Sequence, residues 1–180
     1  LEEPILEEVT FKAIQKANYV VYNYARHKPQ SAGNAGTTVT MAVLRGSQAI
    51  IANIGDSRTY LLRKHELRLI TRDHSLVATL VSEGHILPNE IYTHPQRNVI
   101  YRYLGQKDEV QPDLYRYFLQ PGDKLLLCSD GLWEMIRSEE EIMEILEKAA
   151  EPRQACRDLV EAAKRHGGED NISAIVVKAI

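Results

Sequence analysis

Three aspartates stand at the ends of apolar runs, each with a glycine close by, and could do chemistry together. Asp56 and Asp130 each follow an apolar run, and Asp170 lies just before the last β-rich run. Strand ends from one sheet can converge, so the three carboxylates could meet at one rim. Carboxylates without soft ligands select a hard cation, Mg²⁺ or Mn²⁺, over zinc or copper. Two such ions could hold a phosphate and activate a water for in-line attack.

Taken singly, each aspartate has a plainer interpretation, because Asp and Gly together also make ordinary turns. The occurrence of three such rims in one chain favours a shared site. His74, in the run Arg72-Asp73-His74-Ser75, is the histidine of most interest. It could stand behind the carboxylates, or it could only shape the turn into the following helix.

Other hydrolytic chemistries lack their residues. Cys128 is not followed by the arginine that a cysteine-dependent phosphatase needs, and the chain has neither a Gly-x-Ser-x-Gly elbow nor a nucleotide-binding P-loop. Cys128 and Cys156 are far apart and lack the paired spacing of zinc ligands. We therefore expect two reduced cysteines in a cytoplasmic protein.

Composition narrows the class of protein further. The chain has 180 residues, of which 44% are hydrophobic and 26% charged, with a formal net charge of −3. This length predicts one domain over residues 1–180. The slight acidic surplus argues against nucleic-acid binding by bulk charge, and no apolar run approaches the roughly 20 residues that a membrane span needs. Because the chain opens at Leu1 directly on a helical pattern, we expect it to be part of a longer polypeptide.

The periodicity of apolar residues predicts an α+β fold. A helix over residues 4–27 would present Ile5, Val9, Ala13, Ala17, Val20 and Tyr24 on one face. A loop over residues 29–36 leads to an antiparallel meander of strands near 37–44, 48–54, 58–63 and 67–70. Further strands are expected near 114–119, 124–129 and 172–177, with helices over 76–84, 138–150 and 152–166. The polar segment 85–105 would be a structured excursion from the sheet.

Several short stretches, in order, resemble the PP2C (PPM) family of metal-dependent protein serine/threonine phosphatases, of the compact bacterial type. The resemblance covers residues 10–180. The matching stretches are Gly36-Thr37-Thr38, Gly55-Asp56-Ser57-Arg58-Thr59-Tyr60, Asp73-His74-Ser75, His94 to Ile100, Leu104-Gly105, Gly122 to Leu132, and Gly167 to Ser173.

The resemblance implies an αββα sandwich of two antiparallel sheets flanked by helices, with a binuclear Mn²⁺ or Mg²⁺ centre at one end. Asp130 and Asp170 match the family's carboxylates on one core metal, and Asp56 with Asp130 matches the positions that hold a further, weaker ion. No catalytic residue is implied beyond a metal-bound water. Residues 75–104 match the flap beside the family's active site, which varies in conformation and influences substrate choice. The implied partner is a phosphoprotein, the substrate of a cognate Ser/Thr kinase.

The chain departs from the family pattern at its start. The family's Arg-x-x-Asn-(Glu/Asp)-Asp and Asp-Gly-x-Gly-Gly stretches, which supply the carboxylate that bridges both metals, are not in this sequence. We expect half of the metal site to be missing and unpaired sheet edges to favour self-association. The leading hypothesis is a phosphoprotein phosphatase, present here as a fragment. The alternatives are a non-catalytic pseudophosphatase that acts as a binding module, and an unrelated α+β protein whose aspartates only cap turns.

Overall fold

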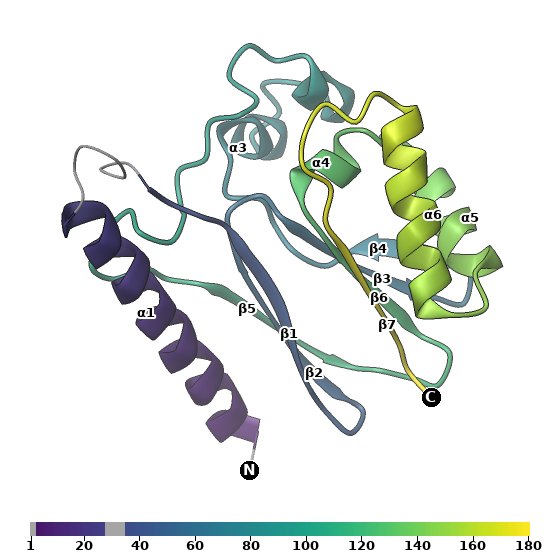
Figure 1. Ribbon diagram of the computed structural model, residues 1–180, viewed down its shortest axis with the longest axis horizontal. Coiled ribbons are helices and arrows are strands. Elements are labelled where there is room, and N and C mark those ends of the chain that lie inside the picture. The colour runs from purple at the N-terminus through teal and green to yellow at the C-terminus, as the bar shows by residue number, and fades with distance from the viewer. Residues whose placement is uncertain (1–2, 28–34) are drawn as a thin grey trace.

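Two antiparallel sheets lie face to face, with helices on both outer sides (Figure 1). The computed structural model describes residues 3–27 and 35–180. The helices are α1 (Glu3–His27), α3 (Leu76–Ser82), the 3-10 helix η1 (Pro88–Tyr92), α4 (Asp130–Trp133), α5 (Glu139–Lys148) and α6 (Pro152–Arg165). The strands are β1 (Val39–Arg45), β2 (Gln48–Ile54), β3 (Arg58–Arg63), β4 (Glu66–Leu69), β5 (Asp113–Phe118), β6 (Lys124–Cys128) and β7 (Ala174–Lys178). The predicted α+β sandwich is confirmed.

The first four strands are divided between the two sheets. One sheet has the order β1-β2-β5 and the other the order β4-β3-β6-β7. The predicted continuous meander is therefore wrong at one point, because β2 pairs with β5 and β3 pairs with β6 instead of pairing with each other. The chain crosses from one sheet to the other between Ile54 and Arg58. That crossing carries Asp56.

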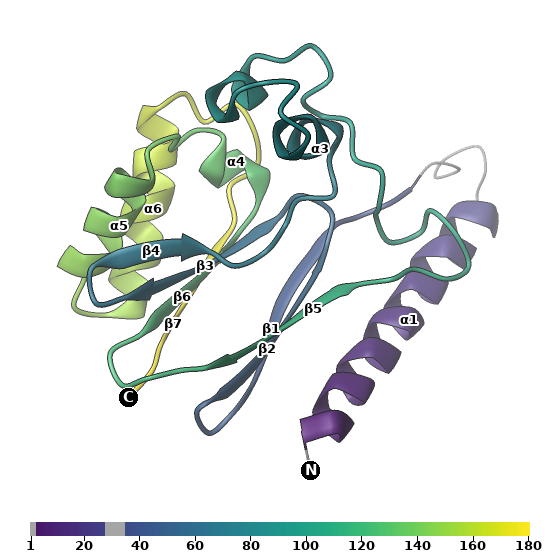
Figure 2. The ribbon, with the colours of Figure 1, turned by 180° about the vertical axis from the view of Figure 1, so that it is seen from behind.

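Three apolar layers hold the sandwich together. Ala49, Ile51, Leu61, Leu125 and Leu127 fill the space between the sheets. Leu126 and Cys128 point the opposite way, into a second layer under α5 and α6, as the two-residue period of a strand requires. The third layer lies between α1 and the other face of β2. Both views place α1 on the outer side of one sheet and α5 and α6 on the outer side of the other (Figures 1 and 2).

The apolar face predicted for α1 is not the face that the helix buries. Val9, Val20 and Tyr24 are 49%, 61% and 51% exposed, whereas Ile14 is 2% and Asn18 0% exposed. The buried stripe is interrupted by polar residues, and each of these has a local partner. Thr10 Oγ1 donates to the carbonyl of Leu6, and Asn18 Nδ2 donates to the carbonyls of Lys107 and Asp108. The neighbouring stripe is more apolar but faces outward. The predicted loop over residues 29–36 lies almost wholly outside the described residues.

The later helices begin where the sequence predicts. The side chain of Ser138 accepts a hydrogen bond from the Glu141 amide at the start of α5, and Pro152 is the first residue of α6. The Glu141 carboxylate contacts His166 Nε2 at 2.9 Å instead of turning back to its own helix. The short helix α4, directly after Ser129, was not predicted. In residues 3–27 and 35–180, no helix is long and apolar enough to cross a membrane.

Candidate metal centre

The register of the four-stranded sheet brings the three aspartates to the same end. β3, β6 and β7 are neighbours, and Arg58 pairs with Cys128, which in turn pairs with Ala174. These three residues form one row across the sheet. Asp56 lies two residues before this row, Asp130 two residues after it and Asp170 four residues before it. The three therefore leave adjacent strands at one edge, the end of the sandwich that carries α3 and α4 (Figure 2).

The segments that carry Asp130 and Asp170 are in direct contact. Ser129 Oγ donates to the Asn171 carbonyl at 3.1 Å and accepts from the Ser173 amide at 3.0 Å. A Cβ atom added to Gly131 would lie 2.4 Å from the Asn171 carbonyl oxygen. Only a residue without a side chain permits this approach, which explains the glycine after Asp130.

The turn that carries Asp56 is fixed from two sides. Gly55 has φ +99°, and an added Cβ would lie 2.3 Å from Thr38 Cγ2. The indole Nε1 of Trp133, in α4, donates to the Asp56 carbonyl at 3.0 Å. The Asp56 turn is thus attached to the helix that begins with Asp130.

The pKa shifts of two acids reflect the proximity of the carboxylates. Burial, together with the negative charges of Asp130 and Asp73, raises the pKa of Asp56 to about 6. Burial also raises the pKa of Glu134, with contributions from Asp130 and Asp170. Asp56, Asp130, Glu134 and Asp170 therefore form an acidic rim, the name used for them below. Glu134, the residue directly after α4, was not predicted from the sequence; its amide donates to the Asp130 carbonyl at 2.8 Å, which places it one helical turn beyond Asp130.

A buried ion pair between Arg58 and Asp73 lies beside Trp133 and close to the acidic rim. The guanidinium of Arg58 donates to both carboxylate oxygens of Asp73, with Nη2 at 2.7 Å from Oδ2. The same guanidinium lies 3.5 Å from the ring centroid of Trp133. Removing one partner of such a pair would leave a buried charge uncompensated, at a cost of about 3–5 kcal/mol.

The acidic rim fits a hard divalent cation in chemistry but is not a complete ligand set. Its donors are all carboxylate oxygens, and their mutual repulsion is what a cation would relieve. Within the described part of the chain, however, no three His, Cys, Asp or Glu side chains are arranged so that they could hold a metal ion. An ion bound at the acidic rim would therefore need ligands other than these carboxylates, such as water, a phosphate group or further residues.

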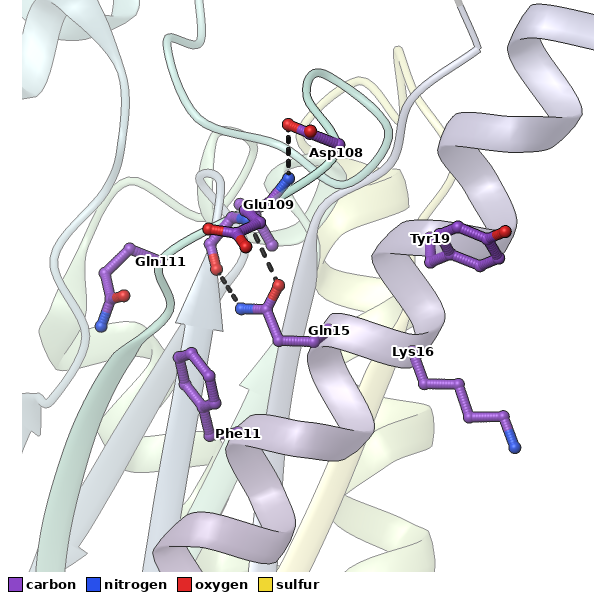
Figure 3. Close-up of a pocket in the computed structure, with 8 residues that line it drawn as sticks. Phe11, Gln15, Lys16, Tyr19, Asp108, Glu109 and Gln111 are labelled. Atoms are coloured by element: carbon purple, nitrogen blue, oxygen red, sulfur yellow. Dashed lines mark hydrogen bonds between the residues drawn. The ribbon is translucent and has the colours of Figure 1, made fainter.

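A cavity elsewhere in the described part of the chain does not belong to the acidic rim. It has a volume of about 650 Å³ and lies between α1 and the segment before β5, lined by Phe11, Gln15, Tyr19 and Asp108 among others (Figure 3). Gln15 contacts the carbonyl and the amide of Val110 there. The cavity contains none of the aspartates predicted to bind metal.

His74 is almost completely buried, and its ring contacts Gly55 at the base of the Asp56 turn. The side chain that caps α3 is that of Ser75, so His74 is not the capping residue. The segment over residues 75–104 consists of α3, η1 and turns. It closes on itself through an isolated bridge between Ser75 and Ile100, and Arg97 Nε reaches to 4.0 Å from Glu134 Oε2. This segment therefore borders the acidic rim.

Two face-to-face antiparallel sheets with helices on both outer sides and an acidic rim at one end define the class of αββα sandwich proteins to which this chain is compared. The family model described as "Stage II sporulation protein E (SpoIIE)" matches residues 12–179. The chain is 40% identical over 167 residues to the serine/threonine phosphatase stp of Listeria monocytogenes, covering 93% of this chain and 66% of stp. It is also 40% identical over 168 residues to the phosphatase PstP of Mycobacterium tuberculosis, covering 93% of this chain and 32% of PstP.

Solved structures agree with these matches. The serine/threonine phosphatase Stp1 of Staphylococcus aureus superimposes with a TM-score of 0.92 at 34% identity, over 100% of this chain and 70% of that one. The catalytic domain of PstP in complex with two manganese ions superimposes with a TM-score of 0.85 at 37% identity, over 94% and 69%. The chain belongs to the bacterial PPM/PP2C-type serine/threonine phosphatase family. It spans about 66% of the length of stp, slightly less than two thirds.

Proposed function

We propose that this chain supplies the larger part of a metal-dependent phosphatase that hydrolyses phosphoserine and phosphothreonine in proteins. One observation carries the proposal: three aspartates leave adjacent strands at one end of the sheet and lie within electrostatic reach of one another or of Glu134. An uncompensated cluster of this kind is unfavourable without a cation. Family membership and the manganese ions in the related PstP structure support the same function.

Each aspartate has a proposed role in holding the ions. Asp130 and Asp170 would bind one Mn²⁺ or Mg²⁺, and Asp56 with Asp130 would bind a further one. Bound ions of this kind supply Lewis-acid stabilisation of the phosphoryl oxygens and a water of lowered pKa. The chain's own part is to orient the carboxylates. The hydrogen bonds of Ser129 to residues 171 and 173 hold the Asp170 loop against α4, and Trp133 holds the Asp56 turn.

The partners and setting proposed for the chain follow from the family. The substrate would be a phosphoprotein modified by a cognate Ser/Thr kinase, and residues 75–104 would border the bound substrate. Residues 1–180 would form a single unit of the phosphatase, corresponding to the C-terminal three quarters of the family domain. A cytoplasmic location fits the free thiols of Cys128 and Cys156.

Phosphatase assays with Mn²⁺ test the proposal. p-Nitrophenyl phosphate and a phosphothreonine peptide are assayed with the 180-residue chain and with a fusion that adds the family's two N-terminal acidic stretches. We expect Asp130→Ala combined with Asp170→Ala to reduce turnover of the active form to that of the metal-free protein. The matched control Asp158→Ala, in α6 and outside the acidic rim, should keep full activity. Activity that survives the double change would contradict the proposal.

A pseudophosphatase that acts as a binding module is the second candidate. It is favoured by the incomplete ligand set in the described residues. Calorimetric titration of the chain with Mn²⁺ separates the two candidates. A phosphatase centre should bind Mn²⁺ in a manner that Asp130→Ala abolishes, whereas a binding module should show only the loose, salt-sensitive association of surface carboxylates.

A further inference from the structure

His74 uses both ring nitrogens inside the protein, and their partners fix its tautomer. The ring is 1% exposed. Nδ1 lies 3.1 Å from the Gly55 amide, which can only donate, so Nδ1 must accept. Because Nδ1 accepts, the proton of the neutral ring lies on Nε2, which is 3.1 Å from both Asp113 Oδ2 and Arg102 Nη1. Of these two partners only the ionised carboxylate can accept it, so Nε2 donates to Asp113 and the Arg102 contact is not a hydrogen bond. The neutral ring therefore forms a continuous link from Gly55 to Asp113.

The Gly55 end of this link determines where Asp56 lies. His74 holds both backbone groups of Gly55, because its own amide also donates to the Gly55 carbonyl at 2.9 Å. Gly55 has a positive φ and sits against Thr38, so the crossing between the sheets has little freedom to move. Trp133 binds the Asp56 carbonyl, so the backbone of Asp56 is held by His74 through Gly55 on one side and by Trp133 on the other.

The Asp113 end of the link attaches to other elements. Asp113 is the first residue of β5, in the three-stranded sheet, and Arg102 Nη1 donates to its Oδ1 at 2.8 Å and to the Gln111 carbonyl at 3.0 Å. The Tyr101 amide donates to the His74 carbonyl at 2.9 Å. The end of the 75–104 segment and the second sheet are thus both connected to the Asp56 turn through one residue.

We propose that His74 is a positioning residue for Asp56: its ring sets the Gly55–Asp56 turn, and Asp113 and Arg102 set the ring. The inference rests on the proposed function for its consequence, namely that Asp56 holds a divalent ion. The other part of the inference, that His74 fixes the Gly55–Asp56 turn, does not depend on a bound metal. Because groups that orient metal ligands typically change metal affinity by about 10–100-fold when removed, the effect should be measurable.

The test uses the 180-residue chain and three variants. His74→Leu removes both hydrogen bonds, whereas His74→Asn can keep an acceptor near the Nδ1 position. Asp113→Ala removes the acceptor at Nε2. His85→Asn, at an exposed histidine, is the matched control.

The first measurement is amide hydrogen exchange at Gly55 in metal-free protein. We expect exchange to accelerate about tenfold or more in His74→Leu, less in Asp113→Ala, and little in His74→Asn or the control.

The second measurement is Mn²⁺ affinity, by calorimetry. We expect His74→Leu to weaken the binding that Asp56→Asn also weakens, by about 10-fold or more, and to have no added effect in the Asp56→Asn background. If His74→Leu acted through a general loss of packing, its effect on Mn²⁺ affinity would instead add to the effect of Asp56→Asn. Rescue by His74→Asn separates positioning from bulk stability.

The outcomes are distinguishable. Wild-type exchange at Gly55 in His74→Leu would overturn the inference. If His74→Leu does not fold, Asp113→Ala decides, and unchanged exchange there would overturn it. If the wild-type chain binds no Mn²⁺ in any form tested, the proposed function fails, while the exchange measurement still decides the role of His74. Equal Mn²⁺ affinity in wild type and in a His74→Leu variant with faster exchange would overturn the link to metal binding.

Discussion

At the scale of single residues, Asp56 shows that the carboxylates of the candidate site are unfavourable to ionise without a cation. Its carboxyl is partly buried beside other acids, and its pKa rises from an ordinary value of 3.8 to about 6. Between these two pH values the folded chain holds a proton that the unfolded chain has lost. Stability from this group is therefore complete below about pH 4 and is lost as pH rises through about 6.

This pH dependence of stability gives a direct prediction for the variant Asp56→Asn. Without divalent ions, the variant should be more stable than wild type at pH 7.5, by about 1–3 kcal/mol, because asparagine carries no charge to bury. The gain should vanish near pH 4. Thermal unfolding at the two pH values measures this gain, with Asp158→Asn, a half-buried aspartate outside the acidic rim, as the control. Added Mn²⁺ should reverse the order, since only the aspartate offers a charged ligand; a variant less stable than wild type at pH 7.5 without metal would contradict the prediction.

The sequence allowed the positions of Asp56, Asp130 and Asp170 at strand ends to be predicted, but not the rest of the rim. Glu134 carried no motif, because its place depends on α4, a helix of four residues that is too short to show periodicity. The buried pair of Arg58 and Asp73 also could not be predicted, since the two are separated by strand β4 and meet only in the fold. Whether the three predicted aspartates bind metal stays a prediction.

At the scale of elements, the contact between α4 and the Asp170 loop depends on the absence of a side chain at Gly131. We predict that Gly131→Ala will lower stability by about 1–2 kcal/mol, because its Cβ would meet a carbonyl oxygen that belongs to the backbone and cannot move away freely. It should also weaken Mn²⁺ binding, since it separates Asp130 from Asp170. Chemical denaturation and calorimetry measure the two effects.

Gly84→Ala is the matched control for this prediction. Gly84 has φ +74° and open space around its Cβ position, so alanine there should cost about 1–2 kcal/mol through the backbone alone. Mn²⁺ affinity should be unchanged. Equal effects of both variants on metal binding would show that the contact between α4 and residue 171 does not matter for the site.

Helix α1 shows why element types were easier to predict than their faces. Its length and start followed from the apolar spacing, but two apolar stripes run along it. Thr10 and Asn18 made the buried stripe look polar, although both satisfy their hydrogen bonds inside the protein. The division of β1 to β4 between two sheets could not be predicted from the strand pattern either, because a tight turn at Gly55 looks the same whether the chain returns to its own sheet or crosses to another.

At the scale of the whole molecule, the described sheets have open edges. β1 and β5 border one sheet and β4 and β7 the other, and each carries an exposed apolar side chain, such as Ile175 at 62%. Unpaired edges of this kind can pair with a second chain. The chain also spans only part of the length of its relatives. Self-association through these edges stays a prediction.

Ile175→Lys tests this prediction. If β7 pairs between copies, a lysine on this edge should shift the association constant toward monomer by about tenfold, because it opposes edge-to-edge pairing. Sedimentation velocity over a concentration series measures it. Leu87→Lys, which replaces an equally exposed apolar residue away from the strands, should leave association unchanged. A wild-type chain that stays monomeric throughout the series would contradict the prediction.

The chain has one tryptophan, and its position gives the protein a built-in optical reporter. The indole of Trp133 is 5% exposed, donates to Asp56 and stacks on the Arg58 guanidinium. Its fluorescence therefore comes from a single known place, with no background from a second indole. Shifts in emission wavelength or quenching can follow events at this end of the sandwich in real time, in unlabelled protein and at low concentration.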